Sequence, residues 1–301
     1  MTLSISTYGL FNSVLGNAKN VQKAEAQASI QESTGLVGTS FEDYGSKSRQ
    51  LLSLQNEATQ AQSWSDNTAT ASNRTQATYS AIGNMITALT SLKTQIASAM
   101  SGSTNTTLNS TGQATLQQLA SELNTQLDGR YLLSGSQTDQ PAVDLTTYQT
   151  TTASTTTADT SYYQGDQQLA SVRVSDSSTI TYGVTADSSG VEEALRSAKL
   201  AAQVTTNPVD TATLTATFDL IGKAITDLSN LQAGVSITSN SLQNAQESQT
   251  SYLSLLGDAT SSIKNVDSAQ ALANVKQLDT QLQASYSALS IVMQVKLTDY
   301  L

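Results

Sequence analysis

The side chains of this chain that could perform acid–base or nucleophilic chemistry are carboxylates, lysines and tyrosines. The sequence contains no histidine and no cysteine. Catalysis by Ser-His-Asp or Cys-His arrangements, zinc bound by thiolates, metal centres built from histidine and carboxylate, and disulfide bonds are therefore excluded. General acid–base work would fall to the remaining groups.

A group of aspartates marks the middle of the chain, at Asp139, Asp144, Asp166, Asp176 and Asp187. They could surround a Ca²⁺ ion, or supply the carboxylate pair that a glycosidase needs about 5 to 10 Å apart across a cleft. They lack the one-three-five spacing of an EF-hand loop, and nothing in the sequence builds a cleft. Solvated turn residues are therefore the favoured interpretation. We predict no catalytic residue, no metal site, no cofactor and no enzymatic activity, with a carbohydrate-binding surface protein as the alternative of another class.

Charge and hydropathy exclude two further classes of partner. The 301-residue chain carries a formal charge of −10 and has a pI near 4.3, so its mean field repels a phosphate backbone and we expect no nucleic acid partner. It lacks a run of about 20 apolar residues, so we expect no membrane insertion. The start lacks a basic segment followed by an apolar one, and we expect any export to proceed without a cleaved signal peptide.

Helical periodicity dominates the first hundred residues. Apolar residues at helical spacing predict a helix over about 1–34, and three glycines within 35–45 predict a loop. Residues 46–100 contain no proline and no cluster of turn residues, so a second, long helix is expected there. The single tryptophan, Trp64, is expected to anchor the core of the helical rod rather than to stack on a ligand.

The pattern then breaks and changes period. Residues 101–110 predict a turn, and a helix is expected from Thr111 to about Leu127, closed by Asp128-Gly129 and returning antiparallel onto the preceding helix. After Tyr131, short alternating runs around 162–184 predict hairpins. The Thr-rich tract 146–160 is either an edge strand or an exposed loop.

Helical spacing returns in the last third of the chain. A helix is expected over 191–204, opened by Glu192-Glu193, and the chain is helical again from Asp210 almost to its end. The apolar stripe before Asp267 and the stripe after Gln270 are out of phase. This predicts a bend or a joint between those two residues.

The expected fold class is mainly α with a small β insertion. The architecture is a long antiparallel coiled-coil rod, built from the N- and C-terminal helices, with an outer β-rich domain. The expected divisions are a terminal helix and loop over 1–45, rod helices over 46–130, the β-rich domain over 131–190, rod helices over 191–267, and a terminal helix over 268–301. The predicted rod core is Ile82, Met85, Leu89, Leu92, Ile96, Tyr252, Leu256 and Ile263.

The terminal helices are expected to mediate self-assembly. A helix with one narrow apolar stripe is marginal by itself, and two thin helices cannot cover each other fully. The remaining surface favours contact with other copies, and a heterologous contact between identical chains propagates into rings or helical filaments. The predicted polymerisation interface is Leu3, Ile5, Leu10, Val14, Leu282, Tyr286, Leu289, Met293, Leu297 and Leu301.

Several short motifs, in a fixed order, carry a family resemblance. They are Gly129-Arg-Tyr-Leu-Leu-Ser-Gly-Ser136 with Thr138-Asp139, Tyr163-Gln-Gly-Asp166, Val172-Arg-Val-Ser-Asp176, Ile180-Thr-Tyr-Gly-Val184, Leu282-Gln-Ala-Ser-Tyr-Ser-Ala-Leu-Ser290 and Lys296-Leu-Thr-Asp-Tyr-Leu301. With these motifs the chain resembles the bacterial flagellin family, and within it the hook-filament junction proteins (hook-associated protein 3). The resemblance spans essentially the whole chain.

The resemblance implies an extracellular structural subunit of the bacterial flagellum, exported unfolded through the type III apparatus. It also implies the partners: identical subunits, the neighbouring axial proteins (a hook-side junction protein and flagellin), and an export chaperone at the C-terminal helix. The final Asp-Tyr-Leu favours a junction protein. The first thirty residues match a typical flagellin start poorly, which leaves a flagellin filament subunit as the alternative within the family.

Overall fold

The computed structural model describes residues 7–102, 107–148, 153–204 and 210–294. The contacts within the chain define two compact units. One comprises Met1–Gln60 with Tyr252–Leu301, and the other comprises Ala61–Ser251. We call them the terminal unit and the central unit.

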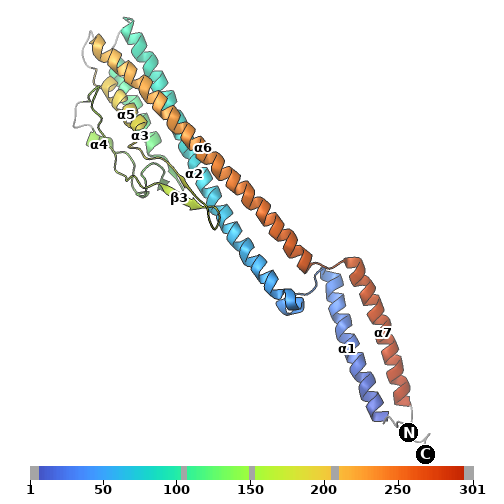
Figure 1. Ribbon diagram of the computed structural model, residues 1–301. Coiled ribbons are helices and arrows are strands. Elements are labelled where there is room, and N and C mark those ends of the chain that lie inside the picture. Colours follow the sequence, from blue (N-terminus) through green and yellow to red (C-terminus); the bar gives the residue numbers. More distant parts are fainter. Residues whose placement is uncertain (1–6, 103–106, 149–152, 205–209, 295–301) are drawn as a thin grey trace, which may run out of the picture. The chain divides into compact units, whose positions relative to one another are not determined.

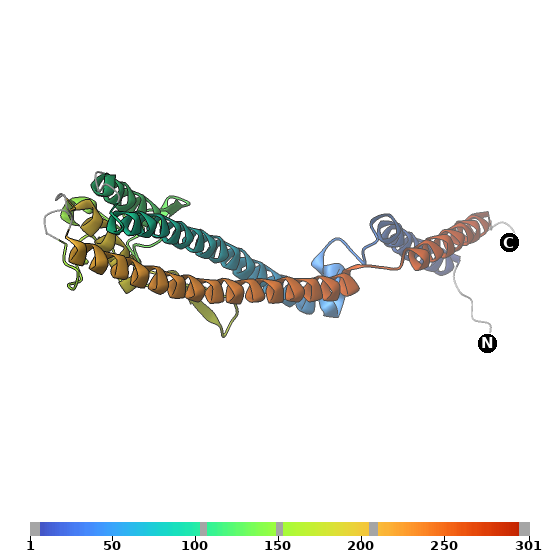
Figure 2. The ribbon, with the colours of Figure 1, turned by 90° about the horizontal axis from the view of Figure 1, so that it is seen from above.

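In the terminal unit, α1 (Thr7–Thr34) and α7 (Ser268–Gln294) lie side by side and antiparallel (Figures 1 and 2). Gly35 ends α1 with a φ of 69°, the left-handed conformation that suits glycine at this position. The peptide N–H of Val37 then donates to the carbonyl of Lys264 at 2.7 Å, and that of Val266 donates to the carbonyl of Gly35 at 2.9 Å. These bonds join the segment after α1 to the end of α6 and to the joint that precedes α7.

The joint between the last two helices lies at residues 265–267, because α6 (Thr211–Lys264) ends just before it and α7 begins just after it. The Asp267 carboxylate accepts bonds from the peptide N–H groups of Ala269, at 2.8 Å, and Gln270, at 3.3 Å. It therefore serves as the N-cap of α7. The out-of-phase stripes correctly predicted a break, which falls slightly earlier than expected.

A 3₁₀ segment, η1 (Phe41–Lys47), follows the loop after α1 and leads into α2 (Ser48–Met100). The Asp43 carboxylate accepts bonds from the peptide N–H groups of Thr39 and Ser40, at 2.9 and 2.8 Å. The predicted loop over 35–45 is thus partly a helical turn, held by an acidic cap that the three glycines gave no reason to expect.

In the central unit, α2 and α6 pack antiparallel. The side-chain amide of Gln232 on α6 donates to the backbone carbonyl of Tyr79 on α2 at 3.2 Å. Further along α2, the Lys93 ammonium lies 4.6 Å from the centroid of the Phe218 ring on α6. Residue numbers therefore rise along α2 in the direction in which they fall along α6, so the two helices run antiparallel. The a/d spacing of α2 places its stripe against this partner, as a coiled-coil seam requires.

Two shorter helices, α3 (Leu108–Leu123) and α5 (Ser189–Ala202), pack together against this pair (Figure 1). Gly112 allows the close approach, since a Cβ there would lie 2.3 Å from the backbone nitrogen of Ala202. One hydrophobic core joins all four helices, and its fully buried members include Met85, Leu119, Leu195 and Ile221.

The helix predicted over 111–127 was wrong at both ends, because α3 begins at Leu108 and ends at Leu123. Asp128 and Gly129 have φ angles of 54° and 73° and form the turn of a hairpin between β1 (Gln126–Leu127) and β2 (Arg130–Tyr131). An Asp-Gly pair with two positive φ angles is the usual two-residue hairpin turn. The sequence pattern wrongly predicts the end of a helix at this dipeptide.

The outer region contains less strand than its composition suggested. Strands β3 (Ala170–Arg173) and β4 (Thr179–Tyr182) pair antiparallel, with Ala170 opposite Tyr182. Within the Thr-rich tract, residues 146–148 belong to a short helix, α4 (Leu145–Tyr148), and residues 153–160 are irregular, so these described residues form no edge strand. Loops and buried side chains, rather than a sheet, hold this region on the helices.

Candidate assembly surface

The terminal helices contact each other through an apolar seam. Its members are Phe11, Val14, Ala18, Val21 and Ala28 from α1, and Ala271, Val275, Leu278, Leu282, Leu289 and Val292 from α7. They follow one another by steps of three, four or seven, as in a two-stranded coiled coil. The seam alanines Ala18, Ala28 and Ala271 are buried, but the larger side chains are only half-buried. Glu25 and Ser285 occupy two further seam positions, so the pair buries little apolar surface.

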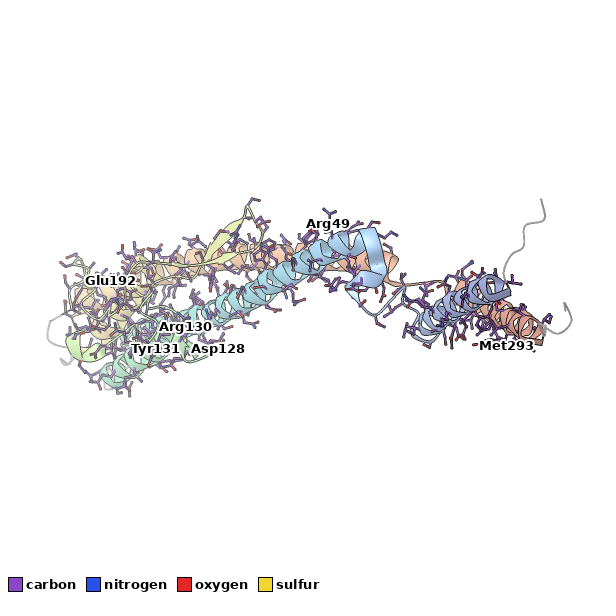
Figure 3. The ribbon with its side chains drawn as sticks, turned by 90° about the horizontal axis from the view of Figure 1, so that it is seen from below. Arg49, Asp128, Arg130, Tyr131, Glu192 and Met293 are labelled. Atoms are coloured by element: carbon purple, nitrogen blue, oxygen red, sulfur yellow. The ribbon has the colours of Figure 1, made fainter. Side chains whose placement is uncertain are left out.

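A second set of large apolar side chains on the same helices is exposed to solvent. It consists of Leu10, Ile30, Leu272, Tyr286, Ile291 and Met293. The exposed fraction reaches 49% at Tyr286, 64% at Ile291 and 65% at Met293. Leu272, Tyr286 and Met293 share one heptad position and so lie along one line of α7, with Met293 near its end (Figure 3). We call the whole set of six the outer stripe, although only these three share a line. Their apolar surface is left uncovered in the lone molecule and is available to a partner.

The residues predicted for the polymerisation interface divide between these two surfaces. Val14, Leu282 and Leu289 lie in the seam, whereas Leu10, Tyr286 and Met293 belong to the outer stripe. Leu3, Ile5, Leu297 and Leu301 lie outside the described residues. The predicted set lacks Ile30, Leu272 and Ile291, although the heptad spacing indicates Leu272, which lies fourteen residues before Tyr286.

The residues predicted for the rod core lie on α2 and α6. Ile82, Met85, Leu89, Leu92 and Ile96 are fully buried, and Leu256 and Ile263 are nearly so. Tyr252 was wrongly placed among them, because 39% of it is exposed. Its hydroxyl lies 3.1 Å from the Glu57 carboxylate, so the ring remains at the surface of the terminal unit.

Two of the aspartates considered as metal or sugar ligands instead accept hydrogen bonds that stabilise turns and loops. The Ser136 hydroxyl and the peptide N–H groups of Ser136 and Gln168 donate to the Asp166 carboxylate and lower its pKa. The Asp144 carboxylate accepts from the Thr146 hydroxyl and peptide N–H, which lower its pKa in the same way. Among the described residues, no group of three Asp or Glu side chains is arranged to hold a metal ion.

Buried charges on α5 fasten the segment that follows α4. Arg196 forms two bonds, of 2.8 and 3.1 Å, with the Glu192 carboxylate, and both side chains are almost fully buried. Arg196 also donates to the carbonyl of Thr155 at 3.0 Å, and the Glu192 carboxylate accepts from the peptide N–H of Asp159 at 2.9 Å. Glu192 had been expected only as a helix-opening carboxylate. It instead joins a structural network.

A buried lysine completes this network. The Lys199 ammonium lies 3.7 Å from the centroid of the Tyr148 ring and donates to the Tyr148 carbonyl. Burial lowers the pKa of Lys199, and the charge of Asp159 opposes that effect. Burial also raises the pKa of the Tyr148 hydroxyl well above its ordinary value. These groups hold a loop on a helix.

Comparison with known families gives two matches, one in each half of the chain. The N-terminal helical region of bacterial flagellin matches residues 5–138, and the C-terminal helical region of bacterial flagellin matches residues 218–301. Together the two matches cover well over half of the chain. The chain belongs to the bacterial flagellin family. The first match includes the β1–β2 hairpin and the motif that follows it, and the second includes most of α6 and all of α7.

Several solved structures share the fold of this flagellin-family chain. A protein from Vibrio parahaemolyticus described as a flagellar hook-associated protein is 15% identical, with a TM-score of 0.60, over 74% of this chain and 100% of that chain. FlgL of Bacillus cereus is 14% identical, with a TM-score of 0.56, over 68% and 97%. Flagellar hook-associated protein 3 from Legionella pneumophila is 13% identical, with a TM-score of 0.56, over 70% and 98%. A comparison with curated proteins gave no match.

These likenesses establish the fold and confirm its class, which is mainly helical with a few small antiparallel strand pairs. No described helix is both long and apolar enough to cross a membrane.

Proposed function

We propose that this chain is a structural subunit of the bacterial flagellum, a hook-filament junction protein that assembles with neighbouring subunits through its paired terminal helices. The observation that carries the proposal is the outer stripe. Large apolar side chains remain exposed on both helices of the terminal unit, in the two regions where the flagellin family matches. Subunit contacts would remove this apolar surface from water.

The proposal assigns a role to each part of the chain. Residues 1–45 and 268–301 form the polymerisation segments, 46–130 and 191–267 form the rod helices, and 131–190 form the outer region. The interface comprises the outer stripe together with Leu3, Ile5, Leu297 and Leu301. The seam residues Val14, Leu282 and Leu289 act indirectly, by holding α1 and α7 in register.

The proposed partners are identical subunits, a hook-side junction protein and flagellin, with an export chaperone that binds the C-terminal helix before assembly. The proposed location is the flagellum outside the cell. A half-covered two-helix unit supports the chaperone role, because a partner helix could cover the α7 seam before α1 does. No reaction is proposed for this chain.

A junction subunit is favoured over a filament subunit because two solved structures that share this fold, those from Vibrio parahaemolyticus and Legionella pneumophila, are hook-associated proteins by their own descriptions. Carbohydrate binding by the acidic turns gains no support. The Asp144 and Asp166 carboxylates are occupied by turn hydrogen bonds, and Asp176 pairs with Arg173.

Seeded assembly of the purified protein tests the role. A junction subunit should add to hook ends only when a hook-side junction protein is present, and should not elongate filament seeds by itself. Electron microscopy of both reactions measures the outcome. Long filaments grown from seeds by this protein alone would instead identify a filament subunit. Failure to add under either condition would reject the assembly role.

A further inference from the structure

Two adjoining pockets lie in the central unit where the β3–β4 hairpin meets α2. The first, of about 70 Å³, is lined by residues that include Arg74, Arg130 and Tyr182. The second, of about 460 Å³, is lined by residues that include Arg74, Tyr182, Trp64 and Arg173. Arg74 and Tyr182 thus line both pockets and mark the boundary between them.

The pockets concentrate positive charge in an acidic protein. Three of the five arginines of the chain line them, although the net charge is −10. Among the described residues that line either pocket there is no aspartate or glutamate. Asp128, beside Arg130 in the hairpin turn (Figure 3), lines neither pocket. Asp176 pairs with Arg173 at 3.2 Å, so Arg173 is partly neutralised.

Arg74 differs from the other two arginines in having no bonded partner for its guanidinium among the described residues. The Nε of Arg130 donates to the Thr138 hydroxyl at 3.1 Å, and that of Arg173 donates to the Ser175 carbonyl at 2.9 Å. The Nε of Arg74 is buried and forms no hydrogen bond. The charge of the Arg74 guanidinium therefore has no ion-pair partner among the described residues, and an anion in the pocket would supply one.

We propose that the first pocket binds an oxyanion, a carboxylate or phosphate group, with Arg74 as its principal ligand and Arg130 as a second. The planar guanidinium matches the geometry of both groups. A cavity of about 70 Å³ has room for a few water molecules, or for one such head group in their place. This inference rests on the pocket alone and is independent of the proposed role in assembly.

The single tryptophan supplies a probe. Trp64 lines the second pocket, which shares Arg74 with the first, so an oxyanion that repositions Arg74 in the first pocket should change the fluorescence of Trp64. Isothermal titration calorimetry of the same titration detects binding that leaves the indole unchanged. The experiment titrates the full chain with sodium phosphate, and with sodium chloride at equal ionic strength. The matched variants are Arg74→Gln and Arg49→Gln. Arg49 is exposed on the same helix, outside both pockets (Figure 3).

The wild type and Arg49→Gln should give a saturable response to phosphate and not to chloride. Arg74→Gln should bind phosphate about tenfold more weakly or worse, as expected for the loss of a charge-assisted hydrogen bond. Arg130→Gln should weaken binding less, and it keeps the test open if Arg74→Gln does not fold. Equal responses to the two salts, or an unchanged affinity in both pocket variants, would overturn the proposal.

Sedimentation equilibrium distinguishes the source of the oxyanion. If an acidic side chain of a second copy occupies the pocket, self-association in chloride should weaken both in phosphate and in Arg74→Gln. If a dissolved anion occupies it, sedimentation should not change while the fluorescence titration remains saturable. Both results retain the oxyanion site. An unsaturable titration combined with unchanged sedimentation would reject it.

Discussion

At the scale of single residues, exposed and seam side chains of α7 should respond in opposite ways to substitution. Tyr286 and Met293 are largely exposed, so Tyr286→Ser with Met293→Ser should leave the fold of the lone molecule almost unchanged. Assembly should be lost, because each such side chain contributes roughly 1.5 to 3 kcal/mol when a neighbour buries it fully. Circular dichroism and electron microscopy of assembly reactions measure the two effects.

The seam variant Leu282→Ala is the matched control for this pair. Leu282 is half-buried between the terminal helices, so its truncation should lower the helicity of the terminal unit itself. Normal assembly by the double variant would show that the outer stripe does not form the subunit contact.

Two glycines on helices should also differ sharply. A Cβ at Gly112 would lie 2.3 Å from the backbone of Ala202, so Gly112→Ala should push α3 away from α5. The expected loss is about 1 to 3 kcal/mol of unfolding free energy, the usual cost of overpacking. Gly234 on α6 has nothing within 4 Å of that position. Gly234→Ala should therefore stabilise by about 0.5 to 1 kcal/mol through helix propensity.

Chemical denaturation of the wild type and both variants measures the difference. The close packing of α3 on α5 would be disproved if Gly112→Ala were as stable as Gly234→Ala.

At the scale of elements, helices with a clear heptad pattern could be predicted from the sequence, because period alone decides them. The seam of α2 at Ile82, Met85 and Leu89 is an example, and it is fully buried as its spacing required. The phase change before α7 was detected for the same reason. Asp128-Gly129 was misinterpreted because one dipeptide suits both a helix end and a hairpin turn, and only the tertiary partner decides between them.

The face of α7 could not be predicted in the same way. Leu282 and Tyr286 are four residues apart, as are Leu289 and Met293, so both pairs fit one helical stripe. In the structure the first member of each pair lies in the seam and the second is exposed. The seam residues and the exposed residues form two adjacent rows on α7. The sequence contains no information on how far the contact with α1 extends across them. The Arg74 pocket was missed because its arginines come from distant segments.

The terminal pair should exchange its amide hydrogens faster than the central helices. The helices α1 and α7 share a thin seam that includes Glu25 and Ser285, whereas α2 packs fully buried side chains against its neighbours in the central unit. Local opening is easier where few apolar contacts are lost. Hydrogen exchange measured by mass spectrometry on the unassembled protein should show fast exchange over 7–34 and 268–294. Protection equal to that of residues 82–96 would mean that the terminal pair is stable without neighbours.

At the scale of the whole molecule, removal of residues 272–301 should separate folding from assembly. The central unit has its own core, centred on residues such as Met85, Leu119 and Leu195, and none of that core lies in the deleted segment. It should therefore remain folded, with an unchanged melting transition and resistance to proteolysis. α1 would lose its partner, and with it the register that presents the outer stripe. The truncated protein should then fail to assemble; subunits that still join hook ends would place the essential contact in the central unit, and a collapsed central unit would show that its core depends on α7.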